Sequence, residues 1–500
     1  MRLFSTNAGR ARARLIKAGV ALVAAALIGG CGDNFRPIVT PITPSGPAPQ
    51  PTSYTVVVSA PSPTSAGVAT IIDYSGDTVM ASAPIGPGPG AFTIDQLGAT
   101  GYTLNSDGTL TNFPISTNLQ QKLITYSTVP AASQLVNLMA PSAGLWAADL
   151  NNNVVDLFQS SPETFKLAIP VATTPVTVVG SPSLRGQREY AISQVTSDPM
   201  ACNVSPSTQP NGFATPIEIV SNATDPPIQL GKCPVYGVQS PDLKRLFVLN
   251  RGDDTITVIN SQNNTLDACT PFTNQNGQTV TCHPTLPLSL SAVQATGITP
   301  PNGTSGMPQT AGPVYAEYNA ATSQLVVSDY DGGTVSVIDV SLDEYGNDSA
   351  TFGTTYTIPV GKDPASVTAL YDGSRAYTAN QADGTVSVVN LVSHTLEKTL
   401  TVVGHPRTVV STQNSLYGKV YVASPDSPYL TILQTTSDLV DTTVLLQGNV
   451  VDVRTTTQNG NSGNANVTSR VPGYGEPCNM PGIPTPTGSQ TLLQACQAMP

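Results

Sequence analysis

Hydrophobic and polar residues alternate with a period of two over short segments, and clusters of Gly, Asp, Asn and Pro separate these segments. The clearest unit runs from Pro364 to Val403. It predicts four short strands, rich in β-branched residues: 366–370, 375–379, 385–390 and 399–403. The turns at 371–374 and 380–384 each contain Asp-Gly, which supplies the backbone angles of a hairpin.

The unit returns in register along the chain. A proline that opens one unit is followed 21 residues later by the threonine that opens its third strand; the pairs are Pro234 and Thr255, Pro313 and Thr334, and Pro364 and Thr385. A repeated unit of the length of Pro364 to Val403 is one supersecondary module that buries its apolar face against its neighbours. Four short antiparallel strands per module predict the blade of a β-propeller.

The number of modules follows from their second strands. We count them at 54–60, 101–104, 145–149, 189–193, 246–250, 325–329, 376–380 and 420–424. The sequence therefore predicts an all-β fold, a β-propeller of seven or eight four-stranded blades over residues 53–456, and the count favours eight. A lone strand at 449–453 follows the last module, while the first module lacks an inner strand. We expect 449–453 to complete the blade that begins at Tyr54 and to close the ring, which protects strand edges.

Two segments carry a family resemblance. Residues 372–380 and then 383–390, Asp-Gly-Thr-Val-Ser-Val-Val-Asn, resemble the YVTN-type β-propeller repeat. The closing motif of that family, apolar-x-Val-Gly-x-x-Pro, is matched by 358–364. The match is specific over 230–435 and degenerate over 53–200. It implies a propeller, commonly of seven blades in that family.

The first 30 residues are expected to be a signal peptide. Five basic residues without an acidic one precede an apolar run at 18–28, which is too short for an ordinary membrane span. Residues 27–31 read Leu-Ile-Gly-Gly-Cys and resemble a bacterial lipobox, in which Cys31 is lipidated. The residue after Cys31 is Gly32 and not Asp, and the resemblance implies that this favours the outer membrane over retention at the inner one. The alternative is an ordinary signal peptide with Cys31 incidental.

Residues 31–52 are rich in Pro, Ser and Thr and predict an extended tether. The lipidated cysteine would anchor this tether, and with it the propeller, to the membrane. Residues 457–500 are low in complexity and predict an irregular tail.

Six further cysteines are an even number in an exported chain, so three disulfides are expected. Six cysteines allow 15 pairings. We favour the local ones: Cys202 with Cys233, Cys269 with Cys282, and Cys478 with Cys496. A zinc site is not indicated, because no Cys-x-x-Cys spacing occurs.

Charge limits the partners. The chain has 21 basic and 32 acidic residues, and removal of the five basic residues of the signal peptide leaves 16 against 32. A nucleic-acid surface needs a basic stripe, so no nucleic-acid partner is expected. The expected partners are the membrane, through the lipid, and a protein or glycan of the cell envelope; the propeller itself is expected to be a monomer.

Two insertions interrupt the repeat. Residues 194–213 lie between the second and third strands of module four, and residues 261–311 follow the third strand of module five. Successive turns of an antiparallel blade alternate between its ends, so we expect the insertions on opposite faces of the ring. Long loops on a rigid scaffold often bind ligands, although decorative surface loops are an equal alternative.

One face of the ring holds the candidate ligand-binding residues: Arg251, Asp253, Lys362, His405 and Arg407. Residues 251–253 also read Arg-Gly-Asp, the tripeptide that integrins recognise, but a hairpin turn is the simpler interpretation. His405 stands in a loop of the Val-Gly-x-x-Pro type and is a candidate for the mouth of the ring. Glu317 and Asp329 are candidates for the central channel.

No catalytic residue, metal site or cofactor is predicted. The three histidines, His283, His394 and His405, fall in separate loops without carboxylates at ligand spacing, and no nucleophile elbow or P-loop occurs. The sequence thus favours an envelope-anchored, periplasmic or surface-exposed lipoprotein that binds or scaffolds an unknown ligand. The alternative is a propeller enzyme, such as a lactonase-like hydrolase or an oxidoreductase, which rests on analogy of fold alone.

Overall fold

The computed structural model describes residues 53–62, 64–141, 144–159, 164–180, 188–196, 201–273, 277, 279–288, 310–412 and 418–456. The chain divides at residue 50, and every described residue belongs to the second unit, Pro51–Pro500.

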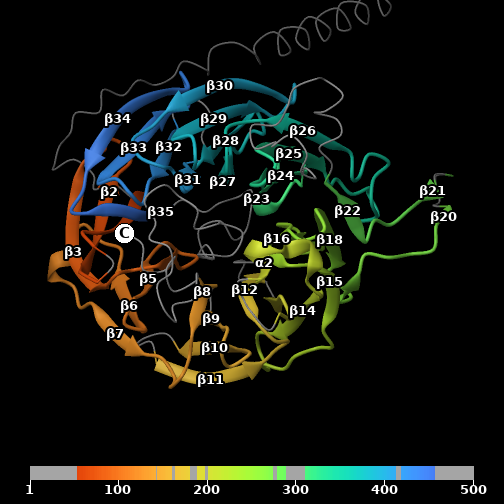
Figure 1. Cartoon of the computed structure of the whole chain (residues 1–500), viewed down its shortest axis with the longest axis horizontal. Helices are drawn as coiled ribbons and strands as arrows, with labels where there is room; N and C mark the ends of the chain where they lie inside the picture. Colours follow the sequence, from red (N-terminus) through yellow and green to blue (C-terminus); the bar gives the residue numbers. More distant parts are fainter. Residues whose placement is uncertain are drawn as a thin grey trace, which may run out of the picture. The chain divides into compact units, whose positions relative to one another are not determined.

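Eight sheets of antiparallel strands follow one another in that unit as the blades of a β-propeller (Figure 1). The all-β prediction and the count of eight are both confirmed. The inner strands of neighbouring blades lie beside one another, and each chain segment then runs outward to the rim.

The strands of blades one to four have the following bounds, given from the innermost to the outermost. Blade one consists of β35 (Asn449–Thr455), β1 (Tyr54–Ala60), β2 (Ala66–Asp73) and β3 (Val79–Pro87). Blade two consists of β4 (Ala91–Ile94), β5 (Thr100–Leu104), β6 (Thr109–Pro114) and β7 (Thr125–Thr128). Blade three consists of β8 (Leu135–Met139), β9 (Leu145–Asp149), β10 (Val154–Gln159) and β11 (Thr164–Pro170). Blade four consists of β12 (Pro175–Gly180), β13 (Arg188–Ser193), β14 (Asn211–Glu218) and β15 (Ile228–Lys232).

Blades five to eight follow the same order. Blade five consists of β16 (Pro234–Gln239), β17 (Arg245–Asn250), β18 (Thr255–Asn260), β19 (Thr265–Leu266) and β22 (Thr285–Pro287). Blade six consists of β23 (Pro313–Asn319), β24 (Gln324–Asp329), β25 (Thr334–Asp339) and β26 (Thr355–Pro359). Blade seven consists of β27 (Pro364–Ala369), β28 (Arg375–Asn380), β29 (Thr385–Asn390) and β30 (Thr395–Thr401). Blade eight consists of β31 (Thr408–Ser411), β32 (Lys419–Ala423), β33 (Tyr429–Gln434) and β34 (Leu439–Leu445). Short helical turns lie at η1 (Leu119–Gln121), α2 (Ala201–Val204) and η2 (Pro206–Thr208).

The ring closes through the C-terminal strand, as predicted. β35 pairs antiparallel with β1, with Val57 opposite Val453, and supplies the inner strand that blade one lacks. The strand is two residues longer than expected and ends at Thr455. β35 thereby covers the edge of β1 that would otherwise be unpaired.

Hydrogen bonds between the second and third strands explain why the repeat keeps its polar residues. In blade seven, Asn380 Nδ2 donates to Thr385 Oγ1 at 3.0 Å and to Ser387 Oγ at 2.9 Å. Asn250 makes the corresponding bonds to Thr255 and Thr257 in blade five. These bonds give the buried amide donors of both asparagines partners inside the sheet, where an unpaired donor is costly.

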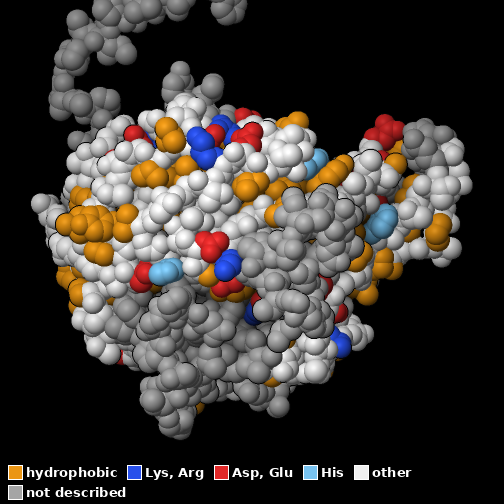
Figure 2. Space-filling model, turned by 45° about the horizontal axis from the view of Figure 1, so that its top comes forward, with side chains coloured by type: hydrophobic (Ala, Val, Ile, Leu, Met, Phe, Trp, Pro, Cys, Tyr) orange, Lys and Arg blue, Asp and Glu red, His pale blue; other side chains and the backbone are white. Residues whose placement is uncertain are grey.

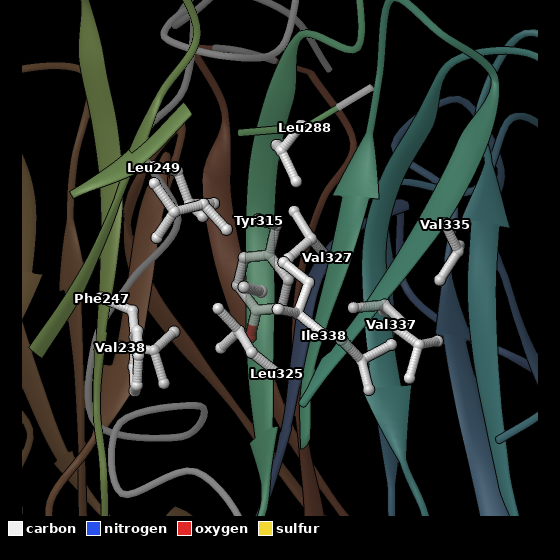
Figure 3. Packing of buried hydrophobic residues seen from close by; sticks show 14 of the residues in the cluster. Val238, Phe247, Leu249, Leu288, Tyr315, Leu325, Val327, Val335, Val337 and Ile338 are labelled. Carbon is white, nitrogen blue, oxygen red and sulfur yellow. The ribbon is translucent and has the colours of Figure 1, made fainter. Parts of the chain in front are cut away.

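Apolar side chains from adjacent blades pack against each other between the sheets. Between blades five and six, Val238, Phe247 and Leu325 belong to one buried cluster (Figure 3). Tyr236 and Tyr315 bring their ring centroids to 4.8 Å in the same cluster. Trp146 in β9 is fully buried, in agreement with a packing role.

Ionic contacts also join neighbouring blades, at the end where the second strand of each blade begins. The second strands β13, β17, β28 and β32 all begin with Arg or Lys. Arg245, which opens β17, is buried and contacts Asp348 of blade six at 3.3 Å and Asp267 at 3.2 Å. Such a cation satisfies groups of two blades at once and fixes their relative position.

The two insertions differ from each other. The described residues of the first insertion remain at the end of blade four, where Cys202 forms a disulfide with Cys233 at the start of blade five, with a Cα–Cα distance of 5.5 Å. The second insertion interrupts the outer strand of blade five, because β19 and β22 both pair with β18. Its hairpin, β20 (Phe272–Thr273) and β21 (Thr279–Val280), lies outside the ring (Figure 1). The second insertion therefore leaves from the rim of the ring, whereas we had expected it to emerge from one face.

The hairpin is closed by the second disulfide, between Cys269 and Cys282, with a Cα–Cα distance of 5.5 Å. Two of the three predicted disulfides are thus confirmed, and they indicate a compartment outside the reducing cytoplasm. The signal peptide, Cys31, the tether, the tail and the pair Cys478–Cys496 lie outside the described residues. No helix in the described part of the chain is long and apolar enough to cross a membrane.

Candidate functional site

Two kinds of connection meet at one end of each blade. They are the loop from the outer strand of one blade to the inner strand of the next, and the turn between the second and third strands. Backbone hydrogen bonds join them: Gln381 N donates to Asp363 O at 2.9 Å, and Arg251 N donates to Cys233 O at 3.1 Å. We call this end of the ring the upper face; it carries all five ligand candidates.

Arg251 is the most buried of these candidates. Its side chain is 3% exposed, and its guanidinium binds both carboxylate oxygens of Asp331 on blade six, at 3.0 and 2.7 Å. It also lies over the ring of Tyr330, 5.9 Å from the centroid. The arginine of the Arg-Gly-Asp turn therefore faces a carboxylate between blades five and six and is turned away from solvent.

Asp253 and Lys362 take part in a contact that recurs around the ring. Asp253 Oδ2 accepts the backbone N–H of Lys232 at 3.2 Å, and Asp383 Oδ2 accepts that of Lys362 at 2.7 Å. In both cases the partners are 21 residues apart. The aspartate of the turn thus holds the loop that enters the same blade, while the Lys362 side chain remains exposed.

His405 lies in the equivalent place on blade eight. Its backbone N–H donates to Asp426 Oδ1 at 2.8 Å, and its Nδ1 lies 2.6 Å from Asp426 Oδ2. The carboxylate thus orients the imidazole through Nδ1, and the side chain remains partly exposed. Arg407 points elsewhere, since its Nη2 donates to the Val451 carbonyl oxygen of β35.

Glu317 and Asp329, the candidates for the central channel, both accept hydrogen bonds from neighbouring strands. A carboxylate oxygen of Glu317 accepts the backbone N–H of Ala369 in the inner strand of blade seven. Asp329 Oδ2 accepts the hydroxyls of Thr334 and Ser336, at 3.0 and 2.6 Å. Burial raises the pKa of Asp329 to about 7, although these two hydroxyls act in the opposite direction.

The other two histidines are placed apart from His405. His283 Nδ1 lies 2.8 Å from Asp348 Oδ2, and its ring stacks on Phe352. This contact attaches the base of the hairpin to blade six. Burial, followed by the charge of Asp348, raises the pKa of Asp267 in the same cluster to about 6. His394 stacks on Tyr356 with ring centroids 3.6 Å apart.

A pocket of about 460 Å³ opens on the upper face between blades three and four. The residues that line it come from the turn of blade three, the loop into blade four and the start of the first insertion: Leu150, Asn151, Asn153, Thr173, Thr174, Val195 and Thr196. None of these side chains is charged. From sequence, only the insertion that contains Val195 and Thr196 stands out; the other lining residues do not, because threonine and asparagine are frequent throughout the chain.

Blade three, whose turn lines the pocket, also carries two neighbouring carboxylates. Asp149 accepts the backbone N–H groups of Gln134 and Asn151, at 2.9 and 3.2 Å. Burial raises the pKa of Asp156 to about 6, and the charge of Asp149 acts in the same direction. Among the described residues, no three His, Cys, Asp or Glu side chains are grouped as a metal site would require.

Comparison with known proteins gives the fold and no family. No protein-family model matches the chain, and no curated protein matches it. Among solved structures, apo AztD from Citrobacter koseri is similar with a TM-score of 0.53 and 9% identity, over 81% of this chain and 97% of that one. The dihydro-heme d1 dehydrogenase NirN is similar with a TM-score of 0.50 and 16% identity, over 83% and 78%. Sqt1 from Saccharomyces cerevisiae has a TM-score of 0.50 and 8% identity, over 76% and 95%. At these identities the likeness concerns the propeller alone.

Proposed function

We propose that the chain is an exported lipoprotein whose propeller, of the YVTN type, binds an envelope component through its upper face. The pocket between blades three and four is the observation that carries the proposal, since small-molecule sites occupy about 300–1,000 Å³. It lies on a rigid ring, beside an insertion that the disulfide of Cys202 and Cys233 attaches to blade five. The two disulfides and the lipobox-like sequence support the export.

Anchoring rests on Cys31. Replacement of this residue by serine removes the acyl acceptor, so Cys31→Ser protein should leave the membrane fraction and remain uncleaved by the lipoprotein peptidase. Fractionation and mass spectrometry of the mature N-terminus measure both. A wild-type chain that begins at a residue other than Cys31 contradicts the anchor.

Binding is tested by capture from intact envelopes with the mature propeller, combined with protease shaving to report on exposure. A specific partner that is retained by the native ring, and lost when the upper face is blocked, supports the proposal. Retention that does not depend on the upper face contradicts it.

The orientation of His405 by Asp426 favours a second candidate, a hydrolase that uses His405 Nε2 as a base. Turnover of a lactone probe that is lost in His405→Ala and Asp426→Asn would establish this activity and displace the binding module. Equal turnover in wild type and both variants excludes the role for His405.

A further inference from the structure

At the pocket, blade four lacks one hydrogen bond that blades five, seven and eight make. In blades five and seven, the residue two positions before the proline of the inner strand donates its N–H to a turn aspartate: Lys232 to Asp253, and Lys362 to Asp383. The equivalent residue of blade four is Thr173. Its backbone N–H has no partner among the described residues.

Neighbouring contacts confirm that these positions correspond. Ala172 N donates to Thr215 Oγ1 at 3.4 Å in blade four, as Gly231 N donates to Thr257 Oγ1 at 3.3 Å in blade five. The loop into blade four therefore corresponds to the loop into blade five up to Thr173. The two differ in the side chain that could accept the next backbone N–H, which is Thr196 in blade four and Asp253 in blade five.

The missing acceptor corresponds to Thr196. Ser193 pairs with Pro175 as Asn250 pairs with Pro234, so Thr196 has the sequence position of Asp253. The shorter Thr196 side chain lines the pocket and is 7% exposed, and its Oγ1 has no partner in the described structure. The pocket thus presents one backbone donor and one buried hydroxyl, both without partners.

The backbone holds this arrangement in an unusual conformation. Val195 has a φ of 56°, in the left-handed region that a β-branched residue rarely adopts. Its N–H donates to Thr173 O at 3.1 Å, and Thr174 Oγ1 donates to Thr196 O at 2.8 Å. Backbone strain of this kind persists where the surroundings fix it, and it is frequent at ligand sites.

We infer that this pocket binds one residue of an uncharged saccharide, whose hydroxyl or amide oxygens bind Thr173 N–H and Thr196 Oγ1. The inference deepens the proposed function and rests on it. A charged ligand is disfavoured, because the lining has no countercharge and Asp149 precedes Leu150. A protein surface is disfavoured because a stable protein interface covers about 800 Å² per partner, whereas this site is a small concavity.

The test titrates the mature protein with N-acetylglucosamine, its β-1,4 dimer and lactose, and with glucuronic acid as the charged probe. Saturation-transfer NMR and calorimetry report binding. Thr196→Asp restores the carboxylate that blades five and seven carry and should fill the site, which weakens neutral-sugar binding at least tenfold. Thr196→Val removes only the hydroxyl and should weaken it at least threefold. Thr399→Asp, on the exposed β30, is the matched control and should bind as wild type does.

Unchanged melting temperatures first show that the variants are folded. Each binding result then supports or overturns the assignment of the pocket to a neutral saccharide. Binding of a neutral sugar that falls in Thr196→Asp supports the inference. No neutral sugar bound by wild type, equal binding by Thr196→Asp, or tighter binding of glucuronic acid overturns it. Capture of an envelope partner by wild type and Thr196→Asp alike would leave the proposed binding module in place while this pocket assignment fails.

Discussion

The ammonium group of Lys419 lies 2.6 Å from Oδ2 of Asp77, although the two residues are 342 positions apart in the chain. Lys419 opens the second strand of blade eight, and Asp77 lies in the turn after the third strand of blade one. Corresponding cations join other blades, with Arg375 bound to Asp438 and Arg188 bound to the Ser261 carbonyl oxygen. The junction at which the ring closes thus uses the same contact as the junctions within the chain.

Lys419→Met should destabilise the closing junction. The methionine retains the apolar stem but leaves Asp77, 12% exposed, without its cation. Loss of a hydrogen bond to a charged group costs about 1–3 kcal/mol, so the free energy of unfolding should fall by that amount. Urea denaturation, followed by near-UV circular dichroism, measures the change.

The exposed Lys166 in β11 provides the control. Lys166→Met should change the free energy of unfolding by less than about 0.5 kcal/mol, as ordinary surface substitutions do. Equal stability of the two variants would show that the contact between blades eight and one contributes nothing.

Truncation should separate the closing strand from the tail. A chain that ends at Thr456 keeps β35 and should unfold cooperatively at the wild-type temperature. A chain that ends at Gln447 loses β35, exposes the edge of β1 and should aggregate or unfold at a much lower temperature. Calorimetry and size-exclusion chromatography distinguish the two. A stable monomer that ends at Gln447 would contradict closure by this strand.

Much of the ring could be predicted from the sequence because its determinants are local. Alternation and Asp-Gly turns place strands, and the repeated spacing from Pro364 to Thr385 reflects a real pairing, since Pro364 lies opposite Asn380 and Asn380 opposite Thr385. The lone strand after blade eight could be assigned to blade one because a closed ring requires an inner strand there.

The pocket and the charged contacts could not be predicted in the same way. They depend on which loops meet, as Thr174 meets Thr196 at the start of an insertion, and on partners as distant as Lys419 and Asp77. A sequence signal for the inter-blade contacts did exist and was missed: Arg or Lys stands two positions before an aromatic residue at Arg188, Arg245, Arg375 and Lys419. That the protein has no nucleic-acid partner stays a prediction; in the view of Figure 2 the visible Lys and Arg side chains are few and lie near acidic ones.

The two disulfides should differ in what they stabilise. Replacement of Cys202 and Cys233 by alanine removes a bond that attaches the insertion of blade four to blade five, and both cysteines are buried. The free energy of unfolding should fall by about 3 kcal/mol. Thermal unfolding of the double variant measures it.

The matched double variant removes Cys269 and Cys282. This disulfide closes the hairpin outside the ring, so the melting temperature should change little, while proteolytic cleavage between 267 and 284 should accelerate. Mass spectrometry of limited digests locates the cuts. The opposite pattern, with the hairpin disulfide governing the melting temperature, would contradict this division.

Stability should decrease as the pH rises from 5 to 8, and Glu189 should account for part of the loss. Glu189 is fully buried in β13, its carboxylate oxygens have no partner among the described residues, and burial raises its pKa well above 4.5. A raised pKa means that the folded state binds the proton more tightly than the unfolded state does. This contribution is therefore complete below about pH 4.5 and is lost as the pH rises toward the folded pKa. Asp329, with a pKa of about 7, acts in the same direction.

Glu189→Gln keeps the shape of the protonated side chain and cannot ionise. It should flatten the pH dependence and be more stable than wild type at pH 8 by at least about 1 kcal/mol, the equivalent of a shift of roughly one pKa unit. Urea denaturation at pH 5, 6.5 and 8 measures both effects. Glu344→Gln, at an exposed position, should retain the wild-type slope. A Glu189→Gln protein with the wild-type slope would show that the pKa of this carboxyl group is the same in the folded and unfolded states, and the loss of stability would then have to come from Asp329 and the other buried aspartates.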